Sequence, residues 1–373
     1  MHILAINAGS SSIKFSAYRA GDKGELQGSL QAITSGVLEG LEPQGQPRMK
    51  WHDAQGKKQS IDLPPAGDKS PHEAALAVLQ ASLQDWGLRQ VDAIAHRIVH
   101  GGDAYSASVR LDEAALRQLE TYTPLAPLHQ PHNLAGVRAF MRQFPQAVQV
   151  GCFDTAFHST MPALNRRLPL PDSVTALGVK RYGFHGLSYQ FIAQNLLRST
   201  PRAQGKSIMA HLGSGASLCA MEGGRSLATT MSFSALDGLM MGTRPGHLDT
   251  GVLLYLMQQG WSAERLEAML YKESGLLGVS GISGDMRTLR ASGEMRAREA
   301  IALFEQRIVQ EVGSLSATMG GLDVLVFSGG IGENDAATRL AVCDRLVYLG
   351  LGIDRELNAG ATPPPPPPTP PPP

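Results

Sequence analysis

The hydrophobic pattern of the first eighteen residues predicts two strands joined by a tight turn. Residues His2 to Ile6 form a short apolar run, which is typical of a strand buried on both faces. Further along, Ile13, Phe15 and Ala17 alternate with polar residues, which is the period of a strand with one wetter face. The chain therefore opens on a strand, turn and strand.

The turn between these strands has the composition of an anion-binding turn. It contains Asn7, Gly9 and three serines, and Lys14 follows in the second strand. Glycine lets the backbone turn and approach a ligand, and exposed N–H groups and hydroxyls suit phosphate oxygens. An ordinary serine-rich hairpin has the same pattern, so this stretch alone leaves both interpretations open.

The same pattern returns later in the chain. Residues 207–221 again read as apolar strand, Gly/Ser turn and apolar strand, and residues 324–334 read as a strand followed by a third, glycine-rich turn. One phosphate-type hairpin in each half predicts two related domains that face each other across a nucleotide.

The rest of the chain alternates helical periods with short apolar runs, as α/β proteins do. Residues 20–70 are polar and rich in turn formers, and we interpret them as hairpins and loops that decorate the first domain. We expect a loop at 278–287, domains at 1–153 and 154–362, and a polyproline or disordered tail at 363–373. We expect strands at 91–99 and 147–153, and helices at 71–86, 111–122, 134–144, 188–197, 249–259, 262–272, 294–319 and 335–349.

Composition narrows the class of protein. The 373 residues carry a formal net charge of zero, so neither nucleic acid nor an anionic membrane is expected as a partner. No apolar run approaches the length of a membrane span, and no secretory signal precedes the first strand. Three scattered cysteines predict a reducing compartment without a disulfide framework. These features predict a cytoplasmic enzyme.

Candidate catalytic residues lie at strand ends or in glycine-bounded loops, where α/β folds assemble active sites. They are Arg97, Asp154, His185, His211 and Arg244. Two arginines, a histidine loop and two phosphate-type hairpins favour phosphoryl transfer, which needs cations around the transferred group more than a covalent nucleophile. The Gly-x-x-x-x-Gly-Lys-Ser/Thr motif of P-loop enzymes is not found.

Two further histidines invite a different interpretation. His96 and His100 are four residues apart, but on a strand that spacing separates their side chains, and no helical zinc-protease pattern surrounds them. We therefore favour structural histidines over metal ligands at these positions.

An ordered set of motifs resembles the acetokinase family, within the actin-like superfamily of kinases. The motifs run in the family's order over nearly the whole chain, and as a set they are highly specific. They span residues 7–14, 96–102, 124–129, 153–158, 181–186, 211–217, 238–244, 278–281, 285–287 and 328–334.

The resemblance implies an α/β fold of two actin-like (ribonuclease H-like) domains with a nucleotide cleft between them. It implies the reversible reaction ATP + acetate → ADP + acetyl phosphate, with Mg²⁺, or Mn²⁺ in its place, and a homodimer. Propionate kinase, which shares the motifs, is the alternative activity.

The resemblance also implies roles for residues. Arg97 and Arg244 would flank the carboxylate and the phosphoryl group, His185 would bond the equatorial oxygens of that group, and His129 and His211 would support the same site. Asp154 would orient the carboxylate and place the metal with Asn7, while Ser10 and Ser12 would contact phosphates or metal-bound water. The pocket for the substrate methyl would comprise Val99, Leu128, Phe184 and position 235. The nucleotide would contact Ser12, Lys14, His211, Leu212, Gly213, Ser214, Gly215, Asp285, Met286, Arg287, Gly329, Gly330, Ile331, Gly332 and Asn334.

Three departures from the family pattern stand out. Ser214 replaces an asparagine, Ala235 replaces a proline that lines the acyl pocket, and an acidic motif near the family's C-terminus has no counterpart before the proline run. The last departure leads us to expect weaker Mg²⁺ binding and slow turnover. It also keeps a weakly active or inactive nucleotide-binding relic as an alternative.

Ala235 predicts loose discrimination between acyl substrates. Replacing a proline ring by a methyl group enlarges the pocket, and one methylene in an apolar pocket is worth roughly 1–3 kcal/mol of selectivity. We expect kcat/KM for propionate within about tenfold of that for acetate, measured in steady-state assays with both acids. Complete rejection of propionate would mean that the other pocket residues close the site unaided.

Overall fold

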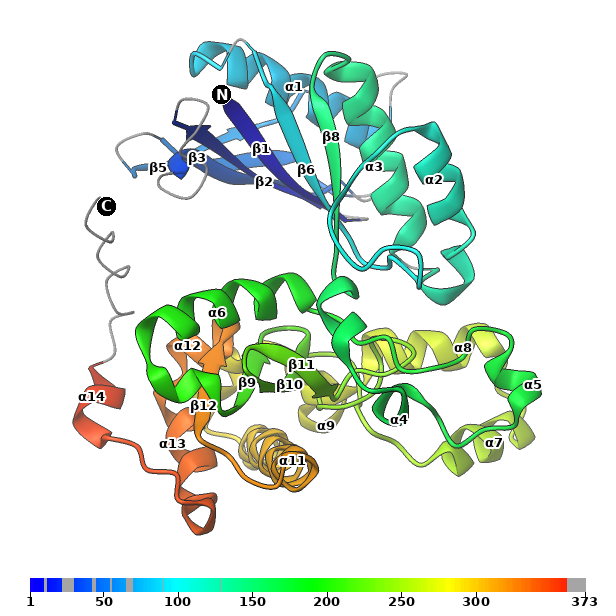
Figure 1. Cartoon of the computed structure of the whole chain (residues 1–373), viewed down its shortest axis with the longest axis vertical. Helices are drawn as coiled ribbons and strands as arrows, with labels where there is room; N and C mark the ends of the chain where they lie inside the picture. Colours follow the sequence, from blue (N-terminus) through cyan, green and yellow to red (C-terminus); the bar gives the residue numbers. More distant parts are fainter. Residues whose placement is uncertain are drawn as a thin grey trace. The chain divides into compact units, whose positions relative to one another are not determined.

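The computed structural model describes residues 1–9, 12–21, 30–41, 45–53, 56–64, 70–88, 90–127 and 129–360. The chain divides into two compact units, the first comprising Met1–Ala156 and the second beginning at Phe157 (Figure 1). The predicted domain boundary, after Phe153, lies close to this division. The predicted proline tail, the site residues Ser10 and Leu128, and Ala361–Thr362 lie outside the described residues.

Unit 1 is built on an eight-stranded sheet with the order β5-β4-β3-β2-β1-β6-β8-β7. The predicted first hairpin is confirmed, because β1 pairs antiparallel with β2, while β6 lies parallel to both β1 and β8. The strands are β1 (His2–Ala8), β2 (Ser12–Ala20), β3 (Leu30–Glu39), β4 (Arg48–His52), β5 (Lys58–Asp62), β6 (Ala93–Ile98), β7 (Val109–Arg110) and β8 (Val148–Phe153).

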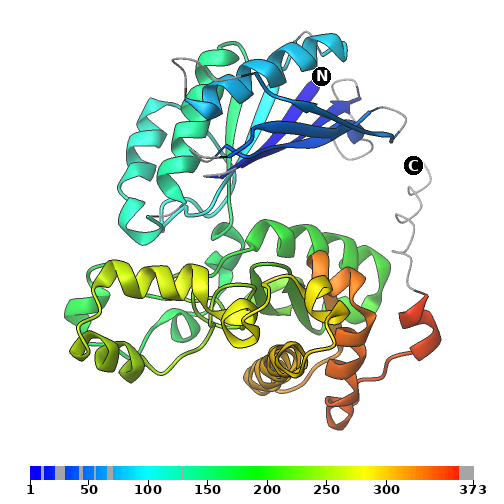
Figure 2. The ribbon, with the colours of Figure 1, turned by 180° about the vertical axis from the view of Figure 1, so that it is seen from behind.

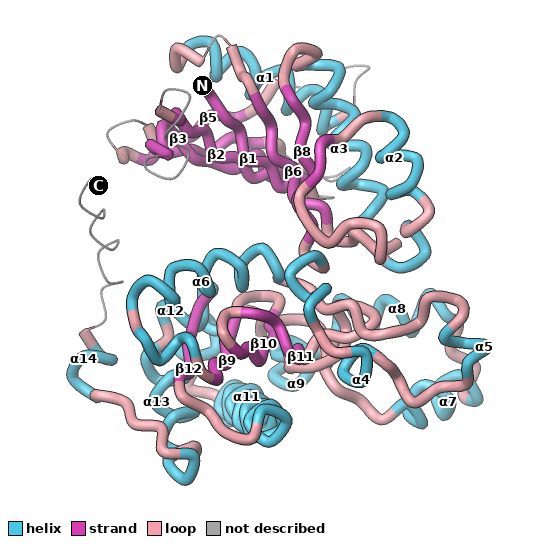
Figure 3. The backbone as a smooth tube through the Cα atoms, viewed as in Figure 1, coloured by secondary structure: helices cyan, strands magenta, loops and turns pink. Residues whose placement is uncertain are grey.

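The core of unit 1 lies on one face of this sheet. Alternate residues of β2 are buried, as predicted, but β1 also alternates, with Leu4 and Ile6 buried and their neighbours half-buried. The expectation that β1 is buried on both faces was therefore wrong, since these side chains pack with Leu79 and Phe140 from helices on a single face (Figure 3). Residues 20–70, which we predicted to be hairpins and loops added to the first domain, also contribute to its central sheet. Strands β3, β4 and β5 continue this sheet in antiparallel register.

The helices of unit 1 confirm the helices that the hydrophobic pattern predicted. Helix α1 (Pro71–Asp85) begins at Ser70, which forms a capping box with Glu73. Helix α2 spans Glu113–Glu120. Helix α3 (Gln130–Gln143) begins earlier than expected, because Pro131 stands in its first turn, where proline costs no hydrogen bond.

Unit 2 contains a four-stranded sheet with the order β11-β10-β9-β12. The predicted second hairpin is confirmed by β9 (Lys206–Leu212) and β10 (Ala216–Glu222), which pair antiparallel, with Ala216 opposite Leu212. Strand β12 (Val324–Ser328) lies parallel to β9, and β11 (Arg225–Thr229) borders β10. Buried residues of β9 and β10 pack against Tyr189 of helix α6.

Most predicted helices of unit 2 are confirmed, including the long α11. Two predictions were wrong. The third glycine-rich turn is a short helix, α12, and the expected loop at 278–287 contains the end of α9 and the start of α10. Glycine lowers the helix propensity of both stretches, and their packing in the fold outweighs it. The helices are α4 (Ala163–Arg166), α5 (Asp172–Thr175), α6 (Gly186–Ser199), α7 (Thr250–Gln258), α8 (Ala263–Ala268), α9 (Gly275–Ser280), α10 (Met286–Ala291), α11 (Met295–Met319), α12 (Gly329–Asn334), α13 (Ala336–Asp344) and α14 (Arg355–Ala359).

Figure 2 shows the helices of both units from behind. Within the described residues, no helix combines the length and the apolar character needed to cross a membrane.

His96 is a structural histidine in the core of unit 1, as its place on a strand suggested. It is 2% exposed, its Nε2 lies 2.7 Å from Gln149 Oε1, and its ring meets Phe140 edge-on. Burial lowers the pKa of His96 from 6.5 to about 4, so the folded protein holds this ring neutral at pH 7.

This depressed pKa predicts a loss of stability in mild acid. The unfolded chain binds a proton at His96 as the pH falls below about 6.5, whereas the folded chain resists until about pH 4. The free energy of unfolding should fall across that window by up to about 3 kcal/mol on account of this residue. Urea unfolding of wild type and of His96→Asn, which cannot titrate, should give a shallower pH dependence for the variant. Equal slopes would contradict the assignment.

Candidate active site

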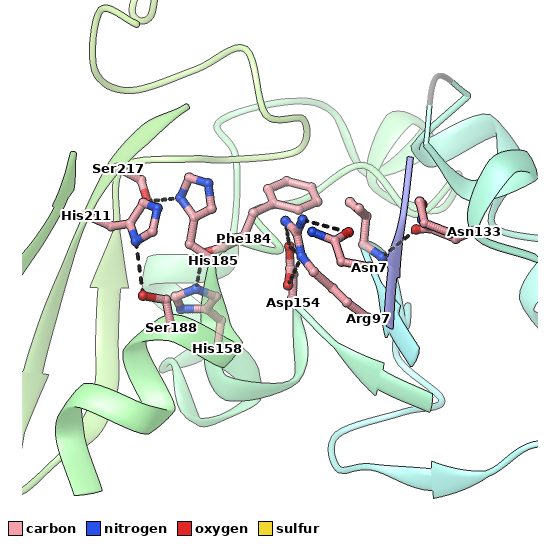
Figure 4. A network of polar contacts seen from close by, with 12 residues as sticks. Asn7, Arg97, Asn133, Asp154, His158, Phe184, His185, Ser188, His211 and Ser217 are labelled. Atoms are coloured by element: carbon pink, nitrogen blue, oxygen red, sulfur yellow. Dashed lines mark hydrogen bonds and ion pairs between the residues drawn. The ribbon is translucent and has the colours of Figure 1, made fainter. Parts of the chain in front are cut away.

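A partly buried ion pair lies at the carboxyl ends of two parallel strands of unit 1. Arg97 belongs to β6, and Asp154 directly follows β8. Arg97 Nε lies 3.0 Å and 3.1 Å from the two oxygens of Asp154, and Nη2 lies 2.6 Å from Oδ2 (Figure 4). The carboxylate is 1% exposed, and its charge raises the pKa of Arg97. This guanidinium is neutralised within its own unit.

Asn7 joins this pair from β1. Arg97 Nη1 donates to Asn7 Oδ1 at 3.3 Å, and Lys14 lies directly opposite Asn7 in the β1–β2 ladder. The structure therefore brings together the predicted residues Asn7, Arg97 and Asp154, with Lys14 on the adjacent strand. Ser12 lies at the start of β2.

The side-chain oxygen atoms of Asn7 and Asp154, which both accept hydrogen bonds from the Arg97 guanidinium, are of the kind that hard metal ions prefer as ligands. No group of three or more His, Cys, Asp or Glu side chains able to hold a metal gathers within the described residues. A carboxylate and an amide oxygen fit Mg²⁺, which keeps waters and binds substrate phosphates rather than filling its shell from the protein.

Two residues that position this site carry no local signal in the sequence. Asn133 on α3 accepts from the Val99 N–H at 3.0 Å and donates to the Ala8 carbonyl at 2.7 Å, which fixes the ends of β6 and β1 together. His72 on α1 donates to the Gly9 carbonyl at 3.0 Å and holds the first turn. Their partners are distant in sequence, so no spacing rule reveals them.

Unit 2 places two predicted histidines beside each other. The rings of His185 and His211 stack with centroids 4.4 Å apart. His185 Nδ1 lies 2.9 Å from Ser217 Oγ, and His211 Nδ1 lies 3.0 Å from Ser188 Oγ (Figure 4). Among the described residues, His185 is the one non-glycine with positive φ, at 59°, a conformation that costs about 1–3 kcal/mol.

The loop that carries His185 is anchored by buried polar side chains. His158 uses both ring nitrogens, Nδ1 at 2.8 Å from Ser226 Oγ and Nε2 at 2.9 Å from the Phe184 carbonyl. Arg181 donates to three consecutive carbonyl groups, residues 229–231, at the end of β11. Gly183 has φ 78°, and a Cβ there would meet the ring of His158 at 2.6 Å. These contacts anchor the loop to β11 and to His158.

Arg244 approaches the β9–β10 turn, where Gly215 has no side chain. A Cβ at Gly215 would lie 2.7 Å from Arg244 Nη2 and 3.5 Å from His185 Nε2. Arg244 Nη1 donates to the Ala235 carbonyl at 2.7 Å, and burial lowers the pKa of the guanidinium. Within the described part of the chain, no carboxylate forms an ion pair with Arg244. Arg244 Nη2 and His185 Nε2 therefore converge on one turn, and Arg244 is a cation without an acid partner among the described residues.

A cavity of about 1200 Å³ opens beside this turn, entirely within unit 2. It contains eight of the predicted nucleotide residues, and glycines of two loops, Gly242 and Gly284, approach closely at its wall. The predicted members are Gly213, Ser214, Asp285, Met286, Arg287, Gly330, Ile331 and Asn334; the residues not predicted for nucleotide binding are Gly242, Thr243, Gly284, Arg290, Ala291 and Asp335.

The charged rim of this cavity is internally paired. Asp285 caps α10 by accepting from the Arg287 N–H at 2.8 Å and pairs with the Arg287 side chain, which lowers the pKa of Asp285 to about 2. Arg290 bridges Glu305 and Asp335 at 2.7 Å and 3.1 Å. The wall of the cavity thus contains exposed glycine backbone, and ion pairs fix the side chains at its rim.

The model of the acetokinase family matches residues 2–365 of this chain. The chain belongs to the acetokinase family. An acetate kinase from Rhodopseudomonas palustris is 45% identical over 96% of this chain and 89% of its own length. The acetate kinase of Porphyromonas gingivalis superposes with a TM-score of 0.84 at 36% identity, covering 96% of this chain and 90% of that one. A propionate kinase from Francisella tularensis gives a TM-score of 0.87 at 34% identity, covering 96% and 91%.

The remaining residues that the acetokinase motifs suggested stay predictions. Val99 and Phe184 are buried in units 1 and 2 respectively, and Ala235 lies half-buried in unit 2. His129 directly precedes α3 in unit 1. Leu212 is fully buried and is not among the residues that line the cavity. Gly215 lies in the β9–β10 turn, and Gly329 and Gly332 lie in α12; none of the three is among the residues that line the cavity.

Proposed function

We propose that this protein is an acetate kinase, which transfers the γ-phosphoryl group of ATP to the carboxylate of acetate and gives acetyl phosphate and ADP reversibly. The observation that carries the proposal is Arg244, a half-buried cation without an acid partner in the described residues, beside His185 and a glycine-walled cavity. Membership of the acetokinase family makes the protein a phosphotransferase with a carboxyl group as acceptor.

The chemistry requires little beyond positioning and charge. Acetate is already ionised at neutral pH, so the acceptor needs no general base. The obstacle is repulsion between a carboxylate and a phosphate, which the planar fork of arginine relieves well. In our proposal Arg97 and Arg244 meet these anions, and His185 donates to the phosphoryl oxygens in the transition state.

The nucleotide takes the cavity of unit 2. The turn at Ser214 faces the phosphates in this proposal, whereas the Gly213 N–H already donates to the Gly215 carbonyl at 3.1 Å. Gly330 and Ile331 meet the adenosine together with Asp285, Met286 and Arg287. His211 and His129 support the phosphates, as the family motif implies.

Mg²⁺ is proposed at the oxygen atoms of Asp154 and Asn7. When bound, the ion supplies neutralisation of the phosphate charge. The chain's own contribution is Arg97, which orients both oxygen donors through the bonds described above. Because Asp154 serves both arginine and ion, removing its charge should weaken the two together.

A second substrate, propionate, is favoured by one observation. Position 235 bears alanine where the family pattern carries proline, and relatives include a propionate kinase from Citrobacter freundii at 38% identity, covering 95% of this chain and 88% of its own length. We propose that propionate is a slower substrate of the same site.

The test of the function is formation of acetyl hydroxamate from acetate, ATP and hydroxylamine. The wild-type protein should give product in the presence of Mg²⁺, with more from acetate than from propionate. Asp154→Asn keeps the shape of the side chain and should lose most of the activity. ADP binding without any product from wild type would instead favour a nucleotide-binding relic.

The variant Arg244→Ala tests the proposed role of this arginine most directly. Losing one donor that meets charge in the transition state should lower kcat by about 10²–10³-fold, with a smaller change in KM. Arg202→Ala, an exposed arginine of unit 2 outside the site, is the matched control. A near-wild-type kcat for Arg244→Ala would remove this arginine from the mechanism.

We also propose that the protein is a homodimer, as the family resemblance implies, with α7 in the contact. This helix has no buried residue, and Leu254, Tyr255 and Met257 are 62%, 60% and 55% exposed. Exposed apolar side chains of this kind are typical of an interface. Because the net charge is zero, electrostatic repulsion between two copies of the chain is small.

Light scattering should therefore give a dimer mass for wild type and a monomer mass for the double variant Leu254→Glu, Met257→Glu. Leu357→Glu, an exposed leucine on α14, is the control and should remain dimeric. A monomeric wild type would overturn the proposal.

A further inference from the structure

A short chain of buried hydroxyl groups ends on His185. Tyr189 of α6 and Ser217 of β10 are both 0% exposed. The Tyr189 hydroxyl lies 2.5 Å from Ser217 Oγ, which in turn lies 2.9 Å from His185 Nδ1. The family motifs include Ser217 but assign no role to it, and Tyr189 lies outside them.

The direction of these hydrogen bonds follows from counting protons. Burial raises the pKa of Tyr189 well above its ordinary value, so the phenol keeps its proton. A buried O–H must find an acceptor, and Ser217 Oγ is the side-chain acceptor that the described structure offers Tyr189. The Ser217 proton then needs an acceptor of its own, and His185 Nδ1 is the one within reach.

The opposite direction leaves a proton without a partner. If His185 carried its proton on Nδ1 and donated to Ser217, the serine oxygen would accept from both neighbours. The Ser217 proton would then lie in the core with no acceptor among its described side-chain contacts, which is costly. Complete pairing therefore selects a neutral His185 that is protonated on Nε2.

We propose that Tyr189 and Ser217 are positioning residues for phosphoryl transfer, which hold His185 in the tautomer that presents Nε2–H at the β9–β10 turn. This inference rests on the proposed function for its kinetic consequence. His185 Nε2 and Arg244 Nη2 lie on the same side of Gly215, 3.5 Å and 2.7 Å from the position of its absent Cβ. The tautomer thus provides a donor where the arginine provides a cation.

The tautomer can be observed without turnover. Two-bond ¹⁵N–¹H correlation spectra of the ¹⁵N-histidine-labelled protein distinguish protonated from unprotonated ring nitrogens, and His185→Gln identifies the signals of this ring. Wild type should show Nε2 protonated and Nδ1 bare but hydrogen-bonded. Ser217→Ala removes the hydroxyl that donates to Nδ1, so both tautomers should then appear. An Nδ1–H ring in wild type overturns the proposal.

Kinetics provide the second readout. Ser217→Ala and Tyr189→Phe should each lower kcat by about tenfold to a hundredfold, because a misplaced donor costs that much, while KM for ATP and acetate stays within about twofold. Ser217→Thr restores the hydroxyl and should recover most of the rate. Ser207→Ala is the control, a buried serine on β9 whose hydroxyl has no hydrogen-bond partner in the described structure.

The outcomes separate the two proposals. An unchanged kcat for Ser217→Ala, or equal losses for Ser217→Ala and Ser217→Thr with normal spectra, overturns the positioning role. An Nε2–H tautomer in a protein that makes no acetyl hydroxamate refutes the proposed function while the hydroxyl chain stands.

Discussion

The missing side chain at Gly215 is the constraint on which the site in unit 2 depends. Arg244 Nη2 lies so close to this turn that any Cβ would sit 2.7 Å from it. The arginine is held there by the Ala235 carbonyl, and His185 is held by Ser217 on the strand that begins at the same turn. The turn continues into Gly213 and Ser214 at the wall of the cavity. The bare backbone of Gly215 therefore lets Arg244 and His185 approach the turn. The turn itself is closed by the Gly213 N–H, which donates to the Gly215 carbonyl at 3.1 Å.

The two arginines of the predicted site differ in whether a carboxylate neutralises their charge. Arg97 lies against the buried carboxylate of Asp154, and the attraction raises its pKa. Arg244 is half-buried and donates to the Ala235 carbonyl, and desolvation lowers its pKa. The charge of Arg97 is compensated by Asp154, whereas the charge of Arg244 is uncompensated, which costs free energy until an anion binds. The arrangement places the unpaired cation beside the cavity, where in our proposal the phosphates bind.

Local periodicity predicted the framework, and long-range contacts account for what it missed. The alternation of Ile13, Phe15 and Ala17 and the long period of α11 have purely local signals, and both were found in the structure. The helices at Gly275 and Gly329 were missed because glycine suggests turns, and tertiary packing overrides its weak propensity. Asn133 was not assigned a role because its acceptor, the Ala8 carbonyl, is 125 residues away. The candidate site followed from motifs, and the residues that hold it in place did not.

The histidines show why residue type alone does not settle a role. His96 and His158 are fully enclosed, and partners on their rings hold them as parts of the core. His185 has the same chemistry, but a left-handed backbone conformation at the start of α6 turns its ring toward the β9–β10 hairpin. The strain of that conformation is sustained by the anchors of the preceding loop, His158 and Arg181. A structural histidine thus fixes the loop that presents a proposed functional one, so the two roles depend on each other.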